Sequence, residues 1–166
     1  SYYRAMHNRA FDQEDVVDSA NAEVRKPVKD IVLQMPGKSS EKLSDYRGKV
    51  VILSFWAGWC NPCLVELPTL VELYKTYRDQ GFEVIPINVD TEKESITWAE
   101  KYWQNKSFPF LTFFDASAEN LKVFSVDSLP ANFVVDKKGK LAFSAYGSND
   151  WNSEEVHDMI EGLLGE

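Results

Sequence analysis

The chain has 166 residues, 44% of them hydrophobic and 27% charged, a balance typical of one globular domain rather than a disordered or fibrous chain. Its net charge of −8 argues against nonspecific binding to nucleic acid, which requires clustered Lys and Arg. The longest apolar run, residues 50–57, is too short to cross a bilayer. Because Ser1 is not an initiator methionine and no signal-like segment follows it, we expect a shortened form of a longer chain, whose upstream part would carry any signal or anchor.

The first 26 residues are polar and acidic, and we predict that they form an N-terminal extension or linker. An alternative for part of this segment is a helix over residues 12–23, because small apolar residues recur there on one side. Pro27 separates the segment from the main domain, which is predicted to span residues 27–166.

The first half of the main domain leads to a buried strand followed by a helix. The expected elements are a strand over 28–33, a turn at 36–38, a short helical turn over 43–49, a strand over 50–55 and a helix over 61–80. The run 50–55 is almost continuously apolar and rich in β-branched residues, which is typical of a central strand buried on both faces. Pro68 predicts a kink in the helix, and Gly81 predicts its end.

The second half of the main domain alternates strands with helices. The expected elements are a strand over 82–89, a helix over 91–104, a strand over 108–114, one or two helical turns over 118–124, a hairpin of strands 132–135 and 141–146, and a helix over 153–164. Thr91 and Glu94 are spaced as a capping box for the first of these helices. The order predicts an α/β fold, with a mixed central sheet and helices on both faces.

The only two cysteines, Cys60 and Cys63, stand three positions apart where the buried strand meets the helix. A disulfide between them would close almost no loop, so a purely structural role is disfavoured. The free N–H groups and dipole at the helix start favour a thiolate at Cys60, and Pro62 costs little in the first turn. We therefore predict thiol–disulfide exchange, in which Cys60 attacks a disulfide and Cys63 resolves the mixed disulfide.

Two other uses of a Cys-x-x-Cys pair fit the sequence less well. A zinc site needs two further Cys or His ligands, and the chain has no third cysteine. A Cys–His nucleophile would need a marked histidine. His7 lies in the N-terminal segment and His157 among charged residues of the last helix, so both are expected to be surface residues. We predict no metal and no cofactor.

Residues 55–63, with the sequence Phe-Trp-Ala-Gly-Trp-Cys-Asn-Pro-Cys, resemble the active site of the thioredoxin superfamily. The fuller pattern over about 28–164 is similar to the TlpA/ResA/CcmG-type branch, which consists of bacterial thiol–disulfide oxidoreductases. The segments that carry this similarity are 48–57, 66–68, 88–103, 126–130 and 133–140. The resemblance implies a thioredoxin-like fold with an N-terminal β-hairpin and a central strand–helix insertion.

The resemblance also implies roles for residues outside the pair. Pro130 matches a cis-proline that faces the cysteines, although a trans turn proline is the alternative. The backbone of Leu129 would then pair with an incoming peptide as an added strand. Glu66 matches an acid that exchanges protons with Cys63, unless it is a surface carboxylate favoured by the helix dipole. Ser54 replaces the buried Asp of plain thioredoxin, which gives Glu66 more weight.

The remaining residues around the pair are expected to shape the surface and the redox potential. Trp59 is predicted to belong to the substrate-facing surface, whereas Trp56 fits a core position equally well. Asn61 and Pro62, between the cysteines, would tune the potential. Because a shift of about 30 mV corresponds to only about 1.4 kcal/mol, the sequence does not give the direction of the reaction.

The leading functional hypothesis is a periplasmic or membrane-tethered reductase of protein disulfides. By resemblance, its clients would be apocytochrome c, as in cytochrome c biogenesis, or a wider set of exported proteins, and its electron donor a membrane protein of the CcdA/DsbD type. The alternatives are a cytoplasmic thioredoxin-like or tryparedoxin-like reductant, a peroxidase of the peroxiredoxin kind, an interaction module without exchange activity, and a copper-delivery module. The copper proteins of this fold use a wider cysteine spacing with a partnering histidine, which this chain lacks.

Overall fold

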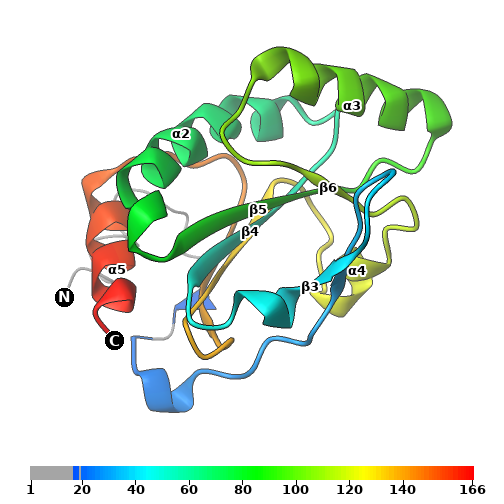
Figure 1. The fold of residues 1–166 in the computed structure, drawn as a ribbon. Coiled ribbons are helices and arrows are strands. Elements are labelled where there is room, and N and C mark those ends of the chain that lie inside the picture. Colours follow the sequence, from blue (N-terminus) through cyan, green and yellow to red (C-terminus); the bar gives the residue numbers. More distant parts are fainter. Residues whose placement is uncertain (1–16, 19) are drawn as a thin grey trace.

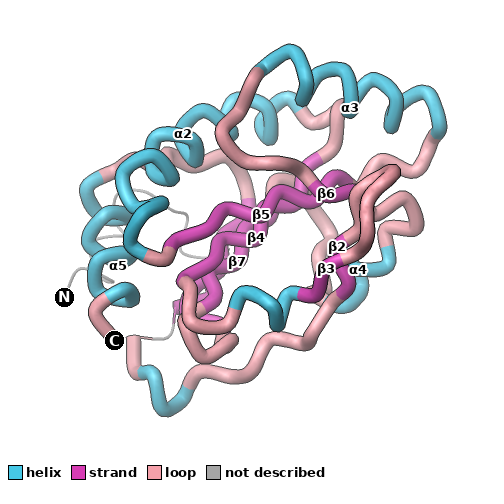
Figure 2. Tube along the Cα trace, in the orientation of Figure 1, coloured by secondary structure: helices cyan, strands magenta, loops and turns pink. Residues whose placement is uncertain are grey.

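The structure is a computed structural model, and it describes residues 17, 18 and 20–166. A six-stranded mixed sheet of order β1-β8-β7-β4-β5-β6 forms its centre (Figures 1 and 2). The strands are β1 (Val17–Asp18), β4 (Val50–Trp56), β5 (Phe82–Asn88), β6 (Phe113–Phe114), β7 (Ala131–Val135) and β8 (Leu141–Tyr146). The helices are α2 (Asn61–Tyr77), α3 (Lys93–Lys106), α4 (Glu119–Val123) and α5 (Glu154–Leu164). In Figure 1, α2 and α5 lie on one side of the sheet and α4 on the other, which confirms the predicted thioredoxin-like α/β fold.

The central strand β4 is buried along all seven of its residues. It pairs in parallel with β5, from Val50 opposite Phe82 to Trp56 opposite Asn88, and antiparallel with β7 on its other side. A parallel pair needs a crossover, which α2 supplies. Because of this crossover, α2 has to start at the end of the sheet where β4 finishes, and that start is where the cysteines lie.

The apolar faces of α2 and α5 fill the core on one side of the sheet. The fully buried apolar residues of these helices are Leu67, Leu70 and Leu73 of α2 and Val156, Met159, Ile160 and Leu163 of α5. The α5 residues recur at helical spacing, which confirms the predicted helix, and Ser153 caps that helix by accepting the N–H of Val156. Helix α2 continues through Pro68 to Tyr77, and a 3₁₀ turn over Arg78–Gln80 ends at Gly81, which has a φ of 87°.

Two predicted strands are shorter than expected. Of residues 28–33, only β2 (Val32–Leu33) is a strand, and it pairs with β3 (Glu41–Lys42) as the predicted N-terminal hairpin. Of residues 108–114, only β6 pairs in the sheet. Pro109 has no N–H to donate, and the Phe110 carbonyl accepts the indole N–H of Trp103 instead of a strand partner.

The predicted capping box at Thr91 is wrong. The N-cap of α3 is one residue later, at Glu92, and no side chain caps the helix. The preceding turn is held instead by the side chains of Asn88 and Asp90, which hydrogen-bond to each other and to the backbone.

The alternative of a helix over residues 12–23 is also wrong where the structure describes that segment. Val17 and Asp18 form β1, which pairs with β8, and Ala22–Val24 form a 3₁₀ turn; residues 12–16 lie outside the described part. The edge of β8 offers unpaired backbone groups that a strand satisfies and a helix does not. The boundary at residue 26 stays a prediction. None of the described helices is long and apolar enough to span a membrane.

Candidate active site

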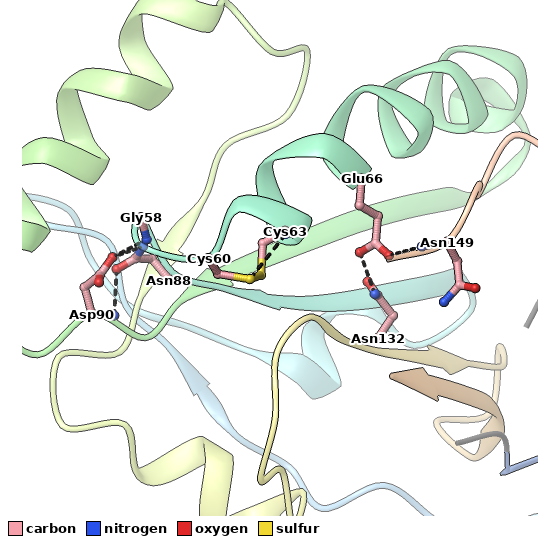
Figure 3. The surroundings of a disulfide bond; sticks show 8 residues. All are labelled: Gly58, Cys60, Cys63, Glu66, Asn88, Asp90, Asn132 and Asn149. Atoms are coloured by element: carbon pink, nitrogen blue, oxygen red, sulfur yellow. Dashed lines mark hydrogen bonds between the residues drawn. A yellow bond between two sulfur atoms is a disulfide. The ribbon is translucent and has the colours of Figure 1, made fainter. Parts of the chain in front are cut away.

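Cys60 lies immediately before the first turn of α2, as its N-cap residue. Its sulfur accepts the backbone N–H of Cys63 over 3.3 Å, so a helix N–H group points at the sulfur that the sequence predicts to be the attacking one (Figure 3). The two cysteines form a disulfide with their Cα atoms 5.3 Å apart. Pro62 stands in the first turn. The predicted placement of the pair at a strand–helix junction is therefore confirmed, and it favours a thiolate at Cys60 when the pair is reduced.

Little of the cysteine pair reaches the surface in this oxidised form. Cys60 is 3% exposed and Cys63 is 2% exposed, whereas Trp59 beside them is 73% exposed. Asn61 and Pro62 are exposed as well. A partner molecule would therefore meet the disulfide beside a rim formed by these three exposed residues.

Pro130 lies at the start of β7, and its peptide bond with Leu129 is cis, as the resemblance implies. The next residue, Ala131, is paired with Phe55 near the end of β4, so the proline lies at the same end of the sheet as the cysteine loop. Pro130 is buried and Leu129 half-buried, and the Pro130 carbonyl accepts the N–H of Gly147 over 2.9 Å.

Glu66 lies one helical turn after Cys63, and its carboxyl group is buried, at 1% exposed. One carboxyl oxygen accepts the side-chain N–H of Asn132 over 2.7 Å, and the other accepts the backbone N–H of Asn149 over 3.0 Å (Figure 3). Burial raises the pKa of Glu66 to about 7, and hydrogen bonds from Asn132, Asn149 and Trp151 partly oppose this rise. The surface-carboxylate alternative is therefore wrong.

A second carboxylate holds the loop that precedes Cys60. Asp90, 3% exposed, accepts the backbone N–H of Gly58 over 2.8 Å and the side-chain N–H of Asn88 over 2.9 Å. Any other residue at Gly58 would force the Trp98 ring to shift, because a Cβ atom would lie 2.8 Å from that ring. Figure 3 shows this cluster on one side of the disulfide and the Glu66 cluster on the other.

Sequence reasoning missed Asp90, Asn88 and Asn132 as parts of the site. Asn132 is a fully buried polar residue inside an apolar strand, and Asp90 is a buried carboxylate two residues after β5. Polar residues at such positions indicate a buried hydrogen-bond network, since burying them is costly unless they are hydrogen-bonded. Their positions in the sequence do not name their partners.

The other residues singled out in the sequence serve the core or lie apart from the pair. Trp56 is 1% exposed, and its indole N–H donates to the Thr112 hydroxyl over 3.0 Å, so it has the core position. His157 lies on α5, where its ring contacts Tyr77 and Asn152. His7 lies outside the described residues. Across residues 17, 18 and 20–166, no three His, Cys, Asp or Glu side chains are grouped as metal ligands would be.

The sequence is similar to a known protein family and to several thiol-disulfide oxidoreductases. Residues 24–144 match the AhpC/TSA family. The chain belongs to this family. It is also 38% identical over 134 residues to the thiol-disulfide oxidoreductase ResA of Geobacillus kaustophilus, covering 81% of this chain and 74% of the relative. The ResA of Bacillus cereus strain ZK / E33L is 33% identical over 134 residues, with 81% and 72% covered.

Solved structures of other thiol–disulfide proteins have the same fold as this member of the AhpC/TSA family. A Chlorobium tepidum protein assigned as thiol:disulfide interchange protein DsbE superposes with a TM-score of 0.76 at 28% identity, covering 85% of this chain and 97% of that one. The exposed lipoprotein thioredoxin Etrx1 of Streptococcus pneumoniae gives a TM-score of 0.66 at 28% identity, covering 81% and 100%. The protein is a ResA-like thiol–disulfide oxidoreductase with a thioredoxin-like fold.

The buried Glu66 gives a testable pH dependence of stability. Its pKa is about 7 in the folded protein against an ordinary value of 4.5, so the folded state keeps a proton that the unfolded chain releases. The stability from this proton is complete below pH 4.5 and is lost as the pH rises through 7. Between these limits the free energy of unfolding should fall by on the order of 3 kcal/mol more in wild type than in Glu66→Gln.

Urea unfolding of the oxidised proteins across this pH range measures the difference. Glu72→Gln, an exposed change on the same helix, is the matched control and should follow the wild type. Parallel pH curves for wild type and Glu66→Gln would contradict the prediction.

Proposed function

We propose that this oxidoreductase reduces disulfides in proteins exported from the cytoplasm, with Cys60 as the attacking thiol and Cys63 as the resolving thiol. The observation that carries the proposal is the position of the Cys60 sulfur, which accepts a helix N–H at the start of α2. This position stabilises negative charge on Cys60, and a thiolate is the form that attacks disulfides.

The reaction passes two electrons from the cysteine pair to the client. The Cys60 thiolate attacks one sulfur of the client disulfide, whose S–S bond breaks, and the other client sulfur leaves as a thiolate and takes a proton. The Cys63 thiol then loses its proton and attacks the Cys60 sulfur. This step forms the Cys60–Cys63 disulfide and releases the second client thiol. A membrane donor of the CcdA/DsbD type would return two electrons and two protons to the pair.

Glu66 is the residue we propose to take the Cys63 proton. It lies one turn from Cys63 on the same helix, and residues at this spacing share one helix face. A carboxyl group with a pKa of about 7 is suited to exchanging protons near neutral pH, whereas an exposed carboxylate would be too weak a base.

The client would approach over the rim and the cis-proline. Leu129, half-buried next to cis-Pro130, would offer its backbone to an extended client segment, and the exposed Trp59 would contact it from the other side. Asn61 and Pro62, exposed between the two cysteines, would set the redox potential of the pair.

An extracytoplasmic location is supported by relatives rather than by a segment of this chain. Etrx1, at 28% identity, is an exposed lipoprotein thioredoxin, and DsbE is a thiol:disulfide interchange protein. For the client, the resemblance to the TlpA/ResA/CcmG-type branch favours apocytochrome c, whose haem-binding motif contains a Cys-x-x-Cys pair.

Turnover by the cysteine pair is tested by insulin reduction with dithiothreitol. Wild type should accelerate insulin precipitation, and Cys60→Ser should reduce the rate to that of dithiothreitol alone, because no attacking thiolate remains. Cys63→Ser should accumulate a mixed disulfide with the client, visible by mass spectrometry. Equal activity of wild type and Cys60→Ser would refute the assigned roles.

The role of Glu66 is tested by the resolving step alone. Starting from a mixed disulfide on Cys60, single-turnover release should accelerate as the pH rises through about 7, where Glu66 loses its proton. Glu66→Gln should slow release on the order of 10²-fold and remove this inflection. Unchanged release with the inflection intact in Glu66→Gln would leave Glu66 with a structural role only.

Client preference is tested with an oxidised peptide that contains the Cys-x-x-Cys-His motif. If apocytochrome c is the client, the reduced protein should react with this peptide at least about tenfold faster than with insulin, because binding contacts add to the exchange chemistry. A scrambled peptide with the same cysteine spacing but no histidine is the control. Equal rates with all three disulfides would instead point to a wide set of exported clients.

A further inference from the structure

A shallow cleft of about 310 Å³ opens directly beside the cysteine pair. Its lining residues are Gly58, Trp59, Glu94, Ser95 and Trp98. Gly58 and Trp59 belong to the loop that ends at Cys60, and the other three belong to α3, which is part of the central insertion. The cleft is thus continuous with the surface over which a client disulfide has to approach.

The two exposed tryptophan side chains of the protein both line this cleft. Of the five tryptophans in the chain, Trp59 is 73% exposed and Trp98 is 47% exposed, while the other three are buried. Both exposed rings line this one cleft. Exposed tryptophans gathered in one place mark a binding surface rather than ordinary surface composition.

The wall formed by Trp98 is fixed before any client arrives. Its ring stacks on Tyr102 with centroids 5.1 Å apart and an interplanar angle of 12°. The ring also lies against the backbone of Gly58, so closely that a Cβ atom on Gly58 would collide with it. The Asp90 carboxylate accepts the N–H of Gly58 and holds that backbone in place (Figure 3). A fixed wall costs little entropy on binding.

Glu94 is the only charged residue that lines the cleft. Its side chain is exposed, and its carboxylate forms no ion pair with any other residue among 20–166. Tryptophan faces attract cations through the ring quadrupole, and a neighbouring carboxylate adds a direct charge partner. A purely apolar side chain would use the rings but would desolvate the carboxylate without compensation.

We propose that this cleft binds an arginine or lysine side chain of an extended client polypeptide, at a position close to the client's reacting cysteine. The inference rests on the proposed function, and it specifies which clients are preferred. Because Trp59 directly precedes Cys60, the bound side chain belongs to a residue within a few positions of the cysteine under attack. Trp98 and Glu94 then act as specificity-determining residues for the exchange reaction.

Short peptides with one cysteine, carried as a mixed disulfide with thionitrobenzoate, test this preference. The reduced protein becomes the Cys60–Cys63 disulfide, and one peptide thiol and one thionitrobenzoate thiol are released for each turnover, the latter being measured by absorbance. An arginine, lysine, leucine or glutamate is placed at each of the three positions on either side of the cysteine. At one position, the arginine and lysine peptides should react about five- to tenfold faster than the leucine peptide.

The measured quantity is the reaction rate of the arginine peptide divided by that of the leucine peptide. A general loss of activity lowers both rates equally and leaves this ratio unchanged. Glu94→Gln, an exposed change, and Trp98→Ala should each bring this ratio toward one. Glu100→Gln removes the same charge from the same helix but lies outside the cleft, so it should keep the wild-type ratio. Added salt should lower the ratio in wild type more than in Glu94→Gln, since exposed ion pairs are screened.

The outcomes separate this inference from the proposed function. A leucine peptide that reacts fastest, or an arginine preference that persists in both Glu94→Gln and Trp98→Ala, would overturn the cationic cleft while exchange activity remains. Failure of the wild type to release thionitrobenzoate from any peptide would instead overturn the proposed function itself.

Discussion

The interaction on which the site depends is the hydrogen bond from the Cys63 backbone N–H to the Cys60 sulfur. It exists because α2 starts where β4 ends, and α2 starts there because β4 and β5 are parallel and need a crossover helix between them. The burial of β4 along its whole length fixes this start relative to the sheet. The chemistry of the cysteine pair is therefore a direct consequence of the sheet topology.

Two buried carboxyl groups, Glu66 and Asp90, lie on opposite sides of the cysteine pair. Glu66, on one side, has its pKa raised to about 7 by burial and is the group proposed to exchange protons. Asp90, on the other side, holds the backbone of Gly58 and thereby the loop that carries Trp59 and Cys60. Both carboxyl groups accept a backbone N–H and an amide N–H, but only Glu66 is proposed to exchange protons, whereas Asp90 positions the loop.

The central insertion extends the active site outward. Helix α3 contributes Trp98 and Glu94 to the cleft next to the cysteine pair, and the same insertion contributes Asp90 beneath it. Since Trp98 packs on the Gly58 backbone, the insertion and the cysteine loop are joined as one surface. With the proposed binding of a client side chain in the cleft, this joining would let the protein distinguish between clients, which the cysteine pair alone cannot do.

Local features of this protein could be read from the sequence, because they depend on neighbours along the chain. The apolar run 50–55, the helix over 153–164 and the cysteines at a strand–helix junction all follow from periodicity and from helix-end chemistry. The fold class, the redox pair and the position of Pro130 followed from these patterns and from the resemblance that they carry. The errors lie where local signals compete with distant partners: Thr91 has the spacing of a cap, yet Asn88 and Asp90 hold that turn.

Only the tertiary structure decided which side chains meet around the pair. Asn132 and Asn149 reach Glu66 across 66 and 83 positions of sequence, and Asp90 reaches Gly58 across 32. Such contacts have no period and no fixed spacing, because they arise from the register of β4 with β7 and from the path of the chain after β5 and β8. The burial that raises the pKa of Glu66, and the meeting of Trp59 with Trp98, are likewise properties of packed elements rather than of any one segment.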